Sequence, residues 1–329
     1  MLRIAIAATA LILGSCGATE ETGKLDPPEF QLDAEPATSK TRKPLPNSSL
    51  AAPVRDLPAF FDCVRKENAM VIAAHRGGPA SGYPENALET MQRTLRSVTP
   101  IMEIDVAESR DGVLFLMHDR SLRRTTGYDG QVADTNWSVI SGLSLRDNDR
   151  KKTSFNPPKL TDVLIWAKEN NAILELDKKE TTSFRNIVSA VRAAGAENNV
   201  ILITYNDNQA GEVARLAPDL MLTASARGGR DIGKLEDLGV DPKNLIVWTG
   251  VNNPDAAAWD RNARNGVESA FGTLGRPGER LDDKYLADGD PVEYEEMMLD
   301  GLVLLATDEA EILARELLGD NKAWERCGR

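Results

Sequence analysis

Histidine is the residue that this sequence most nearly lacks: 329 residues contain two of them. His75 follows the apolar run "VIAA" and His118 follows "LFLM", so each stands directly after a segment typical of a buried strand. Imidazole is the side chain best suited to proton transfer near neutral pH. Acid–base chemistry by histidine would therefore depend on these two positions.

Positive charge is also in deficit. The chain has 39 lysines and arginines against 51 acidic residues, which gives a formal net charge of −12 and a pI of about 4.9. An acidic surface repels phosphate backbones, so we expect no nucleic-acid partner. The same field does not attract anionic small molecules, so an anionic ligand would need local cations or a bound metal.

The apolar run at residues 4–13 is too short to span a bilayer. It follows Arg3 and ends in Leu-Gly-Ser-Cys, and together these features are typical of a secretory signal. The Cys16 junction resembles a bacterial lipobox, which implies a lipoprotein signal peptide over residues 1–16 and lipidation of Cys16. The alternative is an ordinary signal peptide that merely contains a cysteine.

Residues 17–56 are rich in Pro, Thr, Ser, Ala and charge and contain almost no aromatic residues. Such a segment cannot bury enough apolar surface to offset chain entropy, so we expect a flexible tether. A tether behind a lipid anchor places the protein in the bacterial envelope, exported, facing the periplasm, with the membrane as its partner. The sequence does not determine an oligomeric state.

Apolar, β-prone runs alternate with amphipathic helical patterns through residues 57–329, which predicts an α/β fold, a (β/α)8 TIM-type barrel. The strand candidates are residues 70–74, 101–106, 113–117, 172–177, 200–204, 220–224, 244–248, 268–272 and 302–306. The helical patterns are residues 86–97, 159–170, 183–195, 208–217, 254–266 and 308–319. Nine candidates compete for eight barrel positions, so one of them, with 220–224 or 244–248 as the first choices, lies outside the barrel or pairs at its edge. The step from residue 105 to residue 113 is too short for a helix, so we expect an irregular connection there.

Two long connections interrupt the alternation. Residues 119–158, after the third strand, are rich in turn signals and predict a small insertion. Residues 273–299 form a long late loop that is acidic and rich in Gly and Asp. Long connections in barrels are often functional.

Two cysteines remain in this domain, Cys63 and Cys327. An exported chain matures in an oxidising compartment, where a disulfide is allowed. If the barrel closes, its two ends meet, and this pair could join them. The alternative is two free thiols.

Acidic residues are placed within two of the strand candidates at a spacing of two. Glu103 and Asp105 share one face of their strand, and Glu175 and Asp177 share one face of theirs. Carboxylates in apolar strands are costly unless they bind a cation, and hard oxygen ligands suit Ca²⁺ or Mg²⁺. Any one such residue is more often a rim residue with a salt-bridge partner. The joint pattern, at strand ends where barrel active sites lie, favours a metal site.

Several motifs in this order resemble the glycerophosphodiester phosphodiesterase family. They are "AAHRGG", "YPENALET", "MEIDV", "SRDGVLFLMHDRSLRRTTG", "PPKLTDVL", "LELDKK" and "LLATDEAEI". The likeness is dense over residues 71–178 and thins toward residue 310. It implies the same barrel fold and a divalent metal cofactor.

The resemblance also implies a role for each matching residue. His75 and His118 match the family's paired catalytic histidines. Arg76 matches the arginine that contacts phosphate, with Glu85 as the acid near it. The residues that match the metal ligands are Glu103, Asp105 and Glu175.

The chain departs from the family pattern at two positions. Ala87 stands where the family usually has threonine, and Asp177 stands where it usually has a lysine on the same face as Glu175. Lys178, which we assign to substrate binding, points to the opposite side of the strand. Either the substrate phosphate lacks one cation, or the metal gains a fourth carboxylate from Asp177. An unusual substrate, or weaker activity on the standard one, would follow.

These observations favour metal-dependent hydrolysis of glycerophosphodiesters to glycerol 3-phosphate and an alcohol. One histidine would act as base and the other would protonate the leaving alcohol. The nucleophile is either water or the substrate's own 2-hydroxyl. Two alternatives remain: a phospholipase of the C or D type acting on lipid headgroups, and a non-catalytic binding lipoprotein on the same barrel.

Overall fold

The computed structural model describes residues 56–225, 231–316 and 322–328. The predicted signal peptide, the lipidation site Cys16 and all of the tether except residue 56 lie outside the described residues. Within the described ranges, no helix has the length and apolar character needed to cross a membrane.

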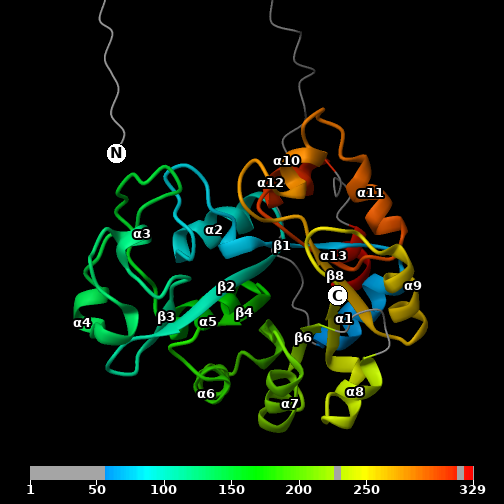
Figure 1. The fold of residues 1–329 in the computed structure, drawn as a ribbon, viewed down its shortest axis with the longest axis horizontal. Coiled ribbons are helices and arrows are strands. Elements are labelled where there is room, and N and C mark those ends of the chain that lie inside the picture. The colour runs from blue at the N-terminus through cyan, green and yellow to red at the C-terminus, as the bar shows by residue number, and fades with distance from the viewer. Residues whose placement is uncertain (1–55, 226–230, 317–321, 329) are drawn as a thin grey trace, which may run out of the picture. The chain divides into compact units, whose positions relative to one another are not determined.

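Eight parallel strands form a closed barrel, which confirms the predicted (β/α)8 fold (Figure 1). In barrel order they are β1 (Val71–Ala74), β2 (Ile101–Glu108), β4 (Leu174–Lys178), β5 (Val200–Ile203), β6 (Met221–Ser225), β7 (Leu245–Trp248), β8 (Glu268–Gly272) and β9 (Leu304–Thr307). Parallel pairing of β1 with both β2 and β9 closes the ring.

The ninth strand is β3 (Leu114–Leu116), which pairs antiparallel with β2, Val106 opposite Leu116. The expectation that residues 220–224 or 244–248 lie outside the barrel is therefore wrong, because these runs form β6 and β7. The reason is connection length. A parallel crossover needs a dozen or more residues, whereas β2 and β3 are joined by a short hairpin turn at Gly112, where φ is +82°.

Side chains alternate between the inner and outer faces of the barrel strands, so the hydrophobic core has two parts. Inward side chains such as Ile101, Ile173, Ile201 and Ile246 pack together inside the ring. Outward side chains pack against the helices between the strands. These helices are α2 (Leu88–Ser97), α5 (Leu160–Asn170), α6 (Phe184–Ala194), α7 (Asp207–Leu216), α8 (Ile232–Asp237), α9 (Ala256–Arg264) and α12 (Ala310–Glu316).

Two terminal helices, α1 (Leu57–Lys66) and α13 (Lys322–Cys327), contact one another and pack against the apolar interior of the barrel. Phe60 stacks on Trp324 at 4.8 Å, and a disulfide joins Cys63 to Cys327. Arg65 pairs with Glu268, the first residue of β8, at 3.0 Å. Strand amino termini face this end of the barrel, so α1 and α13 close the end opposite the strand carboxyl ends.

The segment between β3 and α5 has a small core of its own, which includes Phe115, Leu122, Val132 and Ile140. Its helices α3 (Arg123–Thr126) and α4 (Trp137–Ile140) lie beside β3, away from α7 to α9 (Figure 1). The late connection between β8 and β9 contains α10 (Leu281–Tyr285) and α11 (Val292–Leu299). Short 3₁₀ helices occupy His75–Gly77, Val132–Asp134, Glu197–Asn199 and Pro242–Asn244.

Candidate active site

Four inward carboxylates occupy two layers at adjacent barrel strands. Glu103 of β2 lies in register with Glu175 of β4, and Asp105 lies in register with Asp177. All four side chains are buried, at most 7% exposed. Burial, followed by the neighbouring Asp105 carboxylate, raises the pKa of Glu103 to about 8. Burial and the charge of Asp177 raise the pKa of Glu175 to about 8.

Three of these carboxylates can share a cation. Glu103, Asp105 and Asp177 each offer an oxygen, and these atoms lie within 4.8 Å of one another. Glu175 is not in that group, although the family resemblance implies it as a ligand. The donor set fits a hard divalent ion, because all ligands are carboxylate oxygens. One buried oxygen of the set, Asp177 Oδ1, has no hydrogen-bond partner.

Lysine enters this cluster from a position that sequence reasoning missed. Lys179 Nζ lies 2.6 Å from Asp105 Oδ1 and 2.6 Å from Asp177 Oδ2. The Tyr205 hydroxyl donates to the same Asp177 Oδ2 at 2.6 Å. Lys179 follows Asp177 by two residues, so the period-two alternation of a strand could have placed it on the same face.

Lys178, the lysine predicted to bind substrate, points away from the cluster. Its Nζ lies 5.5 Å from the Phe184 ring centroid and near the carbonyls of Lys179 and Thr182. Lys178 points away because it lies on the opposite face of β4. It is therefore not among the residues of the site.

His75, directly after β1, is held by a chain of polar contacts. Its Nδ1 lies 2.7 Å from Asp308 Oδ1, and Arg280 Nη1 lies 2.9 Å from Asp308 Oδ2. Burial alone would lower the pKa of His75, but the hydrogen bond to Asp308 and the charge of Glu103 leave it raised. Against its own burial, the contacts with His75 and Arg280 hold the pKa of Asp308 at about 2. Asp308 follows β9 directly, and this position after a strand could have identified it from the sequence as a candidate site residue.

His118 has the same arrangement. Its Nδ1 lies 2.7 Å from Asp119 Oδ1, and Arg124 Nε donates to Asp119 Oδ2 at 2.6 Å. Although burial acts in the other direction, these partners hold the pKa of Asp119 at about 2. In both histidines the carboxylate on Nδ1 favours the tautomer that leaves Nε2 for proton transfer. The charge of His75 acts against the burial and the Asp105 charge that raise the pKa of Glu103. Against its own burial, the charges of Lys179 and then of His118 lower the pKa of Asp105.

Arg76 connects the two halves of the site. Its φ of +52° lies in the left-handed region, and its amide donates to Glu103 Oε2 at 2.8 Å. Its guanidinium Nη1 donates to both Glu85 oxygens at 3.0 Å. Arg124 binds the same carboxylate at 2.6 and 2.7 Å, so Glu85 lies between two arginines that keep its pKa low despite burial.

Glycine at 77 is required here, because a Cβ would lie 2.7 Å from Met91 Cγ.

Asn86 of the Pro-Glu-Asn motif forms hydrogen bonds with Asp105. Its side-chain amide donates to Asp105 Oδ2 at 2.6 Å and accepts from the Asp105 amide at 2.9 Å. Asn86 also adopts a positive φ, +57°, which asparagine tolerates better than most residues. The motif therefore orients Asp105 and, through Glu85, Arg76.

The structure brings together six of the eight residues assigned to catalysis, substrate or metal: His75, Arg76, Glu85, Glu103, Asp105 and His118. Glu175 lies beside Glu103 but outside the three-carboxylate group, and Lys178 lies elsewhere. Sequence reasoning raised Asp177 only as a possible extra carboxylate for the metal, and it assigned no role to Asp119, Arg124, Lys179, Tyr205, Arg280 or Asp308.

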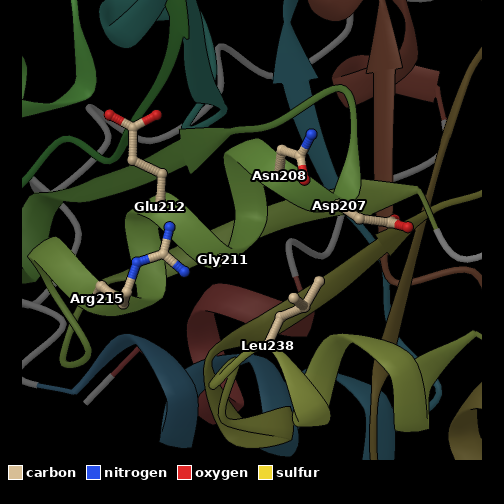
Figure 2. Close-up of a pocket in the computed structure, with 6 residues that line it drawn as sticks. All are labelled: Asp207, Asn208, Gly211, Glu212, Arg215 and Leu238. Atoms are coloured by element: carbon tan, nitrogen blue, oxygen red, sulfur yellow. The ribbon is translucent and has the colours of Figure 1, made fainter.

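A separate surface pocket of about 340 Å³ lies among the outer helices (Figure 2). Its lining comes from α7 and from Leu238 after α8: Asp207, Asn208, Gly211, Glu212, Arg215 and Leu238. It contains neither histidine, and none of the barrel strands contributes to it.

Several known proteins resemble this chain. The model of the glycerophosphoryl diester phosphodiesterase family matches residues 75–241. YqiK of Bacillus subtilis, described as uncharacterized, is 30% identical over an alignment of 184 residues that covers 52% of this chain and 75% of that protein. A glycerophosphoryl diester phosphodiesterase from Parabacteroides distasonis has a TM-score of 0.71 at 23% identity and covers 82% of this chain and 94% of its own.

A phosphodiesterase from Oleispira antarctica, solved in complex with the product sn-glycerol-3-phosphate, has a TM-score of 0.59 at 16% identity. The match covers 77% of this chain and 98% of that one. Identities this low show the shared barrel and nothing finer. The family model, by contrast, spans both histidines and all four inward carboxylates, so this chain belongs to the glycerophosphoryl diester phosphodiesterase family, a family of phosphoric diester hydrolases.

Proposed function

We propose that this protein hydrolyses glycerophosphodiesters to glycerol 3-phosphate and an alcohol, with a divalent cation and two histidines. The observation that carries the proposal is the pair of His–Asp contacts, each 2.7 Å, on either side of one buried carboxylate cluster. Family membership and the glycerol 3-phosphate bound by the Oleispira antarctica phosphodiesterase support this substrate class.

The two histidines divide the proton transfers. Asp308 and Asp119 each hold an Nδ1 proton, so that Nε2 of His75 and of His118 is left to exchange a proton with substrate. The raised pKa of His75 favours its protonated form and therefore the role of acid toward the leaving alcohol. His118 then takes the proton of the attacking oxygen.

Arg76 supplies positive charge where the phosphate would lie. Its Nε is buried without a hydrogen-bond partner, 3.8 Å from Asp105 Oδ2. Both Glu85 oxygens accept from Nη1 of this guanidinium, which orients the group and keeps the unpaired Nε–H pre-organised for an anionic oxygen. Glu103, Asp105 and Asp177 would hold the cation, which would stabilise charge on the phosphate as a Lewis acid.

A hydrolysis screen tests the proposal. Glycerophosphocholine, glycerophosphoethanolamine, glycerophosphoglycerol and glycerophosphoinositol are incubated with the protein in Ca²⁺, in Mg²⁺ and in EDTA, and glycerol 3-phosphate is quantified. Phospholipid vesicles are included as a second substrate arm. Release of glycerol 3-phosphate that stops in EDTA is the expected result. Cleavage of vesicle lipid alone would favour the phospholipase alternative, and no turnover of any substrate would contradict the proposal.

We propose further that Cys16 carries a lipid that anchors the protein in an exported, envelope-bound form. The support is the sequence of residues 1–16 alone. Expression of the wild type and of Cys16→Ala, followed by Triton X-114 partitioning, tests it. The wild type should enter the detergent phase and the variant the aqueous phase; equal partitioning of both would contradict the anchor.

A further inference from the structure

We propose that Asp282, a buried carboxylate of α10, positions Asp308 and, through Asp308, the ring of His75. Residues 273–299, the late connection between β8 and β9, are then a working part of the active site. The inference rests on the proposed function, in which His75 protonates the leaving alcohol, and deepens it. Asp282 acts through Asp308, so it is a positioning residue and not a catalytic one.

The late connection holds Asp308 at three atoms. The pairing of β9 with β1 ends one residue before Asp308, so the sheet does not fix it. Its amide donates to Asp282 Oδ2 at 3.0 Å. Its side-chain Oδ2 accepts from the Gly275 amide at 3.1 Å and lies 2.9 Å from Arg280 Nη1. These contacts leave the other oxygen, Oδ1, to His75 Nδ1 at 2.7 Å.

Asp282 is a fully buried acid, 0% exposed, and among the residues that the structure describes no lysine or arginine forms an ion pair with it. Its oxygens accept from the Tyr294 hydroxyl at 2.8 Å, from the Thr307 hydroxyl at 2.9 and 3.0 Å, and from the Asp308 amide. Burial and the charge of Asp282 raise the pKa of the Tyr294 hydroxyl, which therefore remains a donor. A carboxylate buried among neutral donors is costly unless they are well placed. The structural effect of this acid is to fix the backbone where the chain leaves β9.

The two histidines differ in their dependence on distant segments. Asp119, the partner of His118, is the next residue in the chain. Asp308, the partner of His75, is 233 residues away from it, so tertiary contacts must set the distance between them. The late connection supplies those contacts. Loss of Asp282 should therefore disturb His75 and spare His118.

The nitrogen that carries the proton in each histidine ring tests the inference without any turnover. Because the chain has two histidines, ¹⁵N-histidine labelling of the untagged protein gives two ring signals in an NMR spectrum, and His118→Ala assigns them. Spectra are recorded in EDTA at alkaline pH, where both rings are neutral. In the wild type, His75 should carry its proton on Nδ1, toward Asp308. Asp282→Ala should move this proton toward Nε2 in His75 and leave His118 unchanged.

Hydrolysis of glycerophosphoglycerol gives a second readout. Asp282→Ala should lower kcat by about 10- to 100-fold, the scale known for groups that orient a catalytic residue, and leave KM nearly unchanged. Asp282→Asn keeps one acceptor oxygen for the Asp308 amide, so it should fall between the wild type and Asp282→Ala in both readouts. A merely structural role would lower the melting temperature without this ordered effect on His75 and kcat.

Asp255 offers a matched control. It also accepts from a backbone amide, that of Ala258 at 2.9 Å, but it caps α9 on the outside of the barrel. Asp255→Ala should leave both histidine signals and kcat unchanged. Thermal melting checks that each variant is folded. If Asp282→Ala does not fold, Asp282→Asn takes its place, with a smaller shift in the same direction.

Two results would overturn the inference. In one, the folded Asp282 variant keeps the wild-type proton position in His75 and the wild-type kcat. In the other, the signals of His75 and His118 shift together, which assigns the effect to the site as a whole. A shift of His75 alone, in a protein that hydrolyses no diester, would contradict the proposed function and leave the positioning by Asp282 standing.

Discussion

At the scale of single residues, each histidine of the site is paired with an aspartate that is itself paired with an arginine. The two catalytic candidates have parallel surroundings: Asp308 and Arg280 behind His75, Asp119 and Arg124 behind His118. An arginine behind each aspartate keeps the carboxylate ionised, and the carboxylate orients the imidazole. In the proposed mechanism these partners make the histidines usable for proton transfer, and the aspartates are positioning residues.

Replacement of either histidine should remove most of the activity. His75→Ala and His118→Ala are each expected to lower kcat by 10²- to 10⁴-fold, roughly the contribution of one general acid or base. Release of glycerol 3-phosphate from glycerophosphoglycerol in saturating Ca²⁺ measures the loss. Full activity in the double variant would contradict the assignment.

Asp308→Asn should alter the pH profile as well as the rate. The hydrogen bond and charge of Asp308 raise the pKa of His75, so their loss lowers it. The limb of the kcat/KM profile that reports His75 should therefore move to lower pH, with a reduced plateau. Asp129→Asn, which removes the partner of Arg123 on the surface, is the control and should leave the profile in place.

At the scale of elements, the two ends of the barrel have separate tasks. The carboxyl ends of the strands carry the carboxylates and histidines, while α1 and α13 cover the opposite end. A disulfide holds these two helices, which are 264 residues apart in the chain between Cys63 and Cys327. The stabilising contacts at this end are therefore remote from the chemistry.

Removal of the disulfide should cost stability and spare activity. In the chain-entropy model a loop this long contributes about 5 kcal/mol, so the Cys63→Ser, Cys327→Ser double variant should melt well below the wild type. Its kcat at 25 °C should match that of the wild type, because α1 and α13 do not reach the site. Equal melting temperatures with and without reductant in the wild type would show that the bond adds nothing.

At the scale of the whole molecule, a net charge of −12 surrounds a site that must receive an anion. Arg76, Arg124 and Lys179 supply the local positive charge, and each is paired to an acidic residue in the site. The buried acids also couple global stability to pH, because two of them have a pKa raised to about 8 in the folded chain.

Without metal, the protein should lose stability as the pH rises toward 8. Glu103 and Glu175 ionise near their usual pKa of 4.5 when unfolded but only near 8 when folded. The folded state therefore retains protons that the unfolded state releases, so stability is highest at or below pH 4.5 for these groups and falls through pH 8. Melting temperatures in EDTA from pH 5 to 9 should show the decline, and Ca²⁺ should suppress it. A flat profile in EDTA would contradict the raised pKa values.

The sequence by itself determined the barrel and which side chains of the candidate site share a strand face. Alternating apolar runs and helical patterns suffice for a (β/α)8 fold, since each strand must be buried on both faces. The i, i+2 spacing also placed Glu103 with Asp105 and Glu175 with Asp177, because side chains alternate along any strand. His75 and His118 could be singled out because each follows an apolar strand, β1 and β3 respectively.

Only the tertiary structure decided the register between the inward faces of neighbouring strands. Period-two alternation states which side chains point inward, but the layer that each occupies depends on the register between strands. The pairing of Asp105 with Asp177 therefore placed Asp177 in the carboxylate group and Glu175 one layer below. The same register brought Lys179, not Lys178, to the cluster, and antiparallel pairing removed β3 from the barrel. These outcomes depend on contacts between segments far apart in the chain, which no local pattern contains.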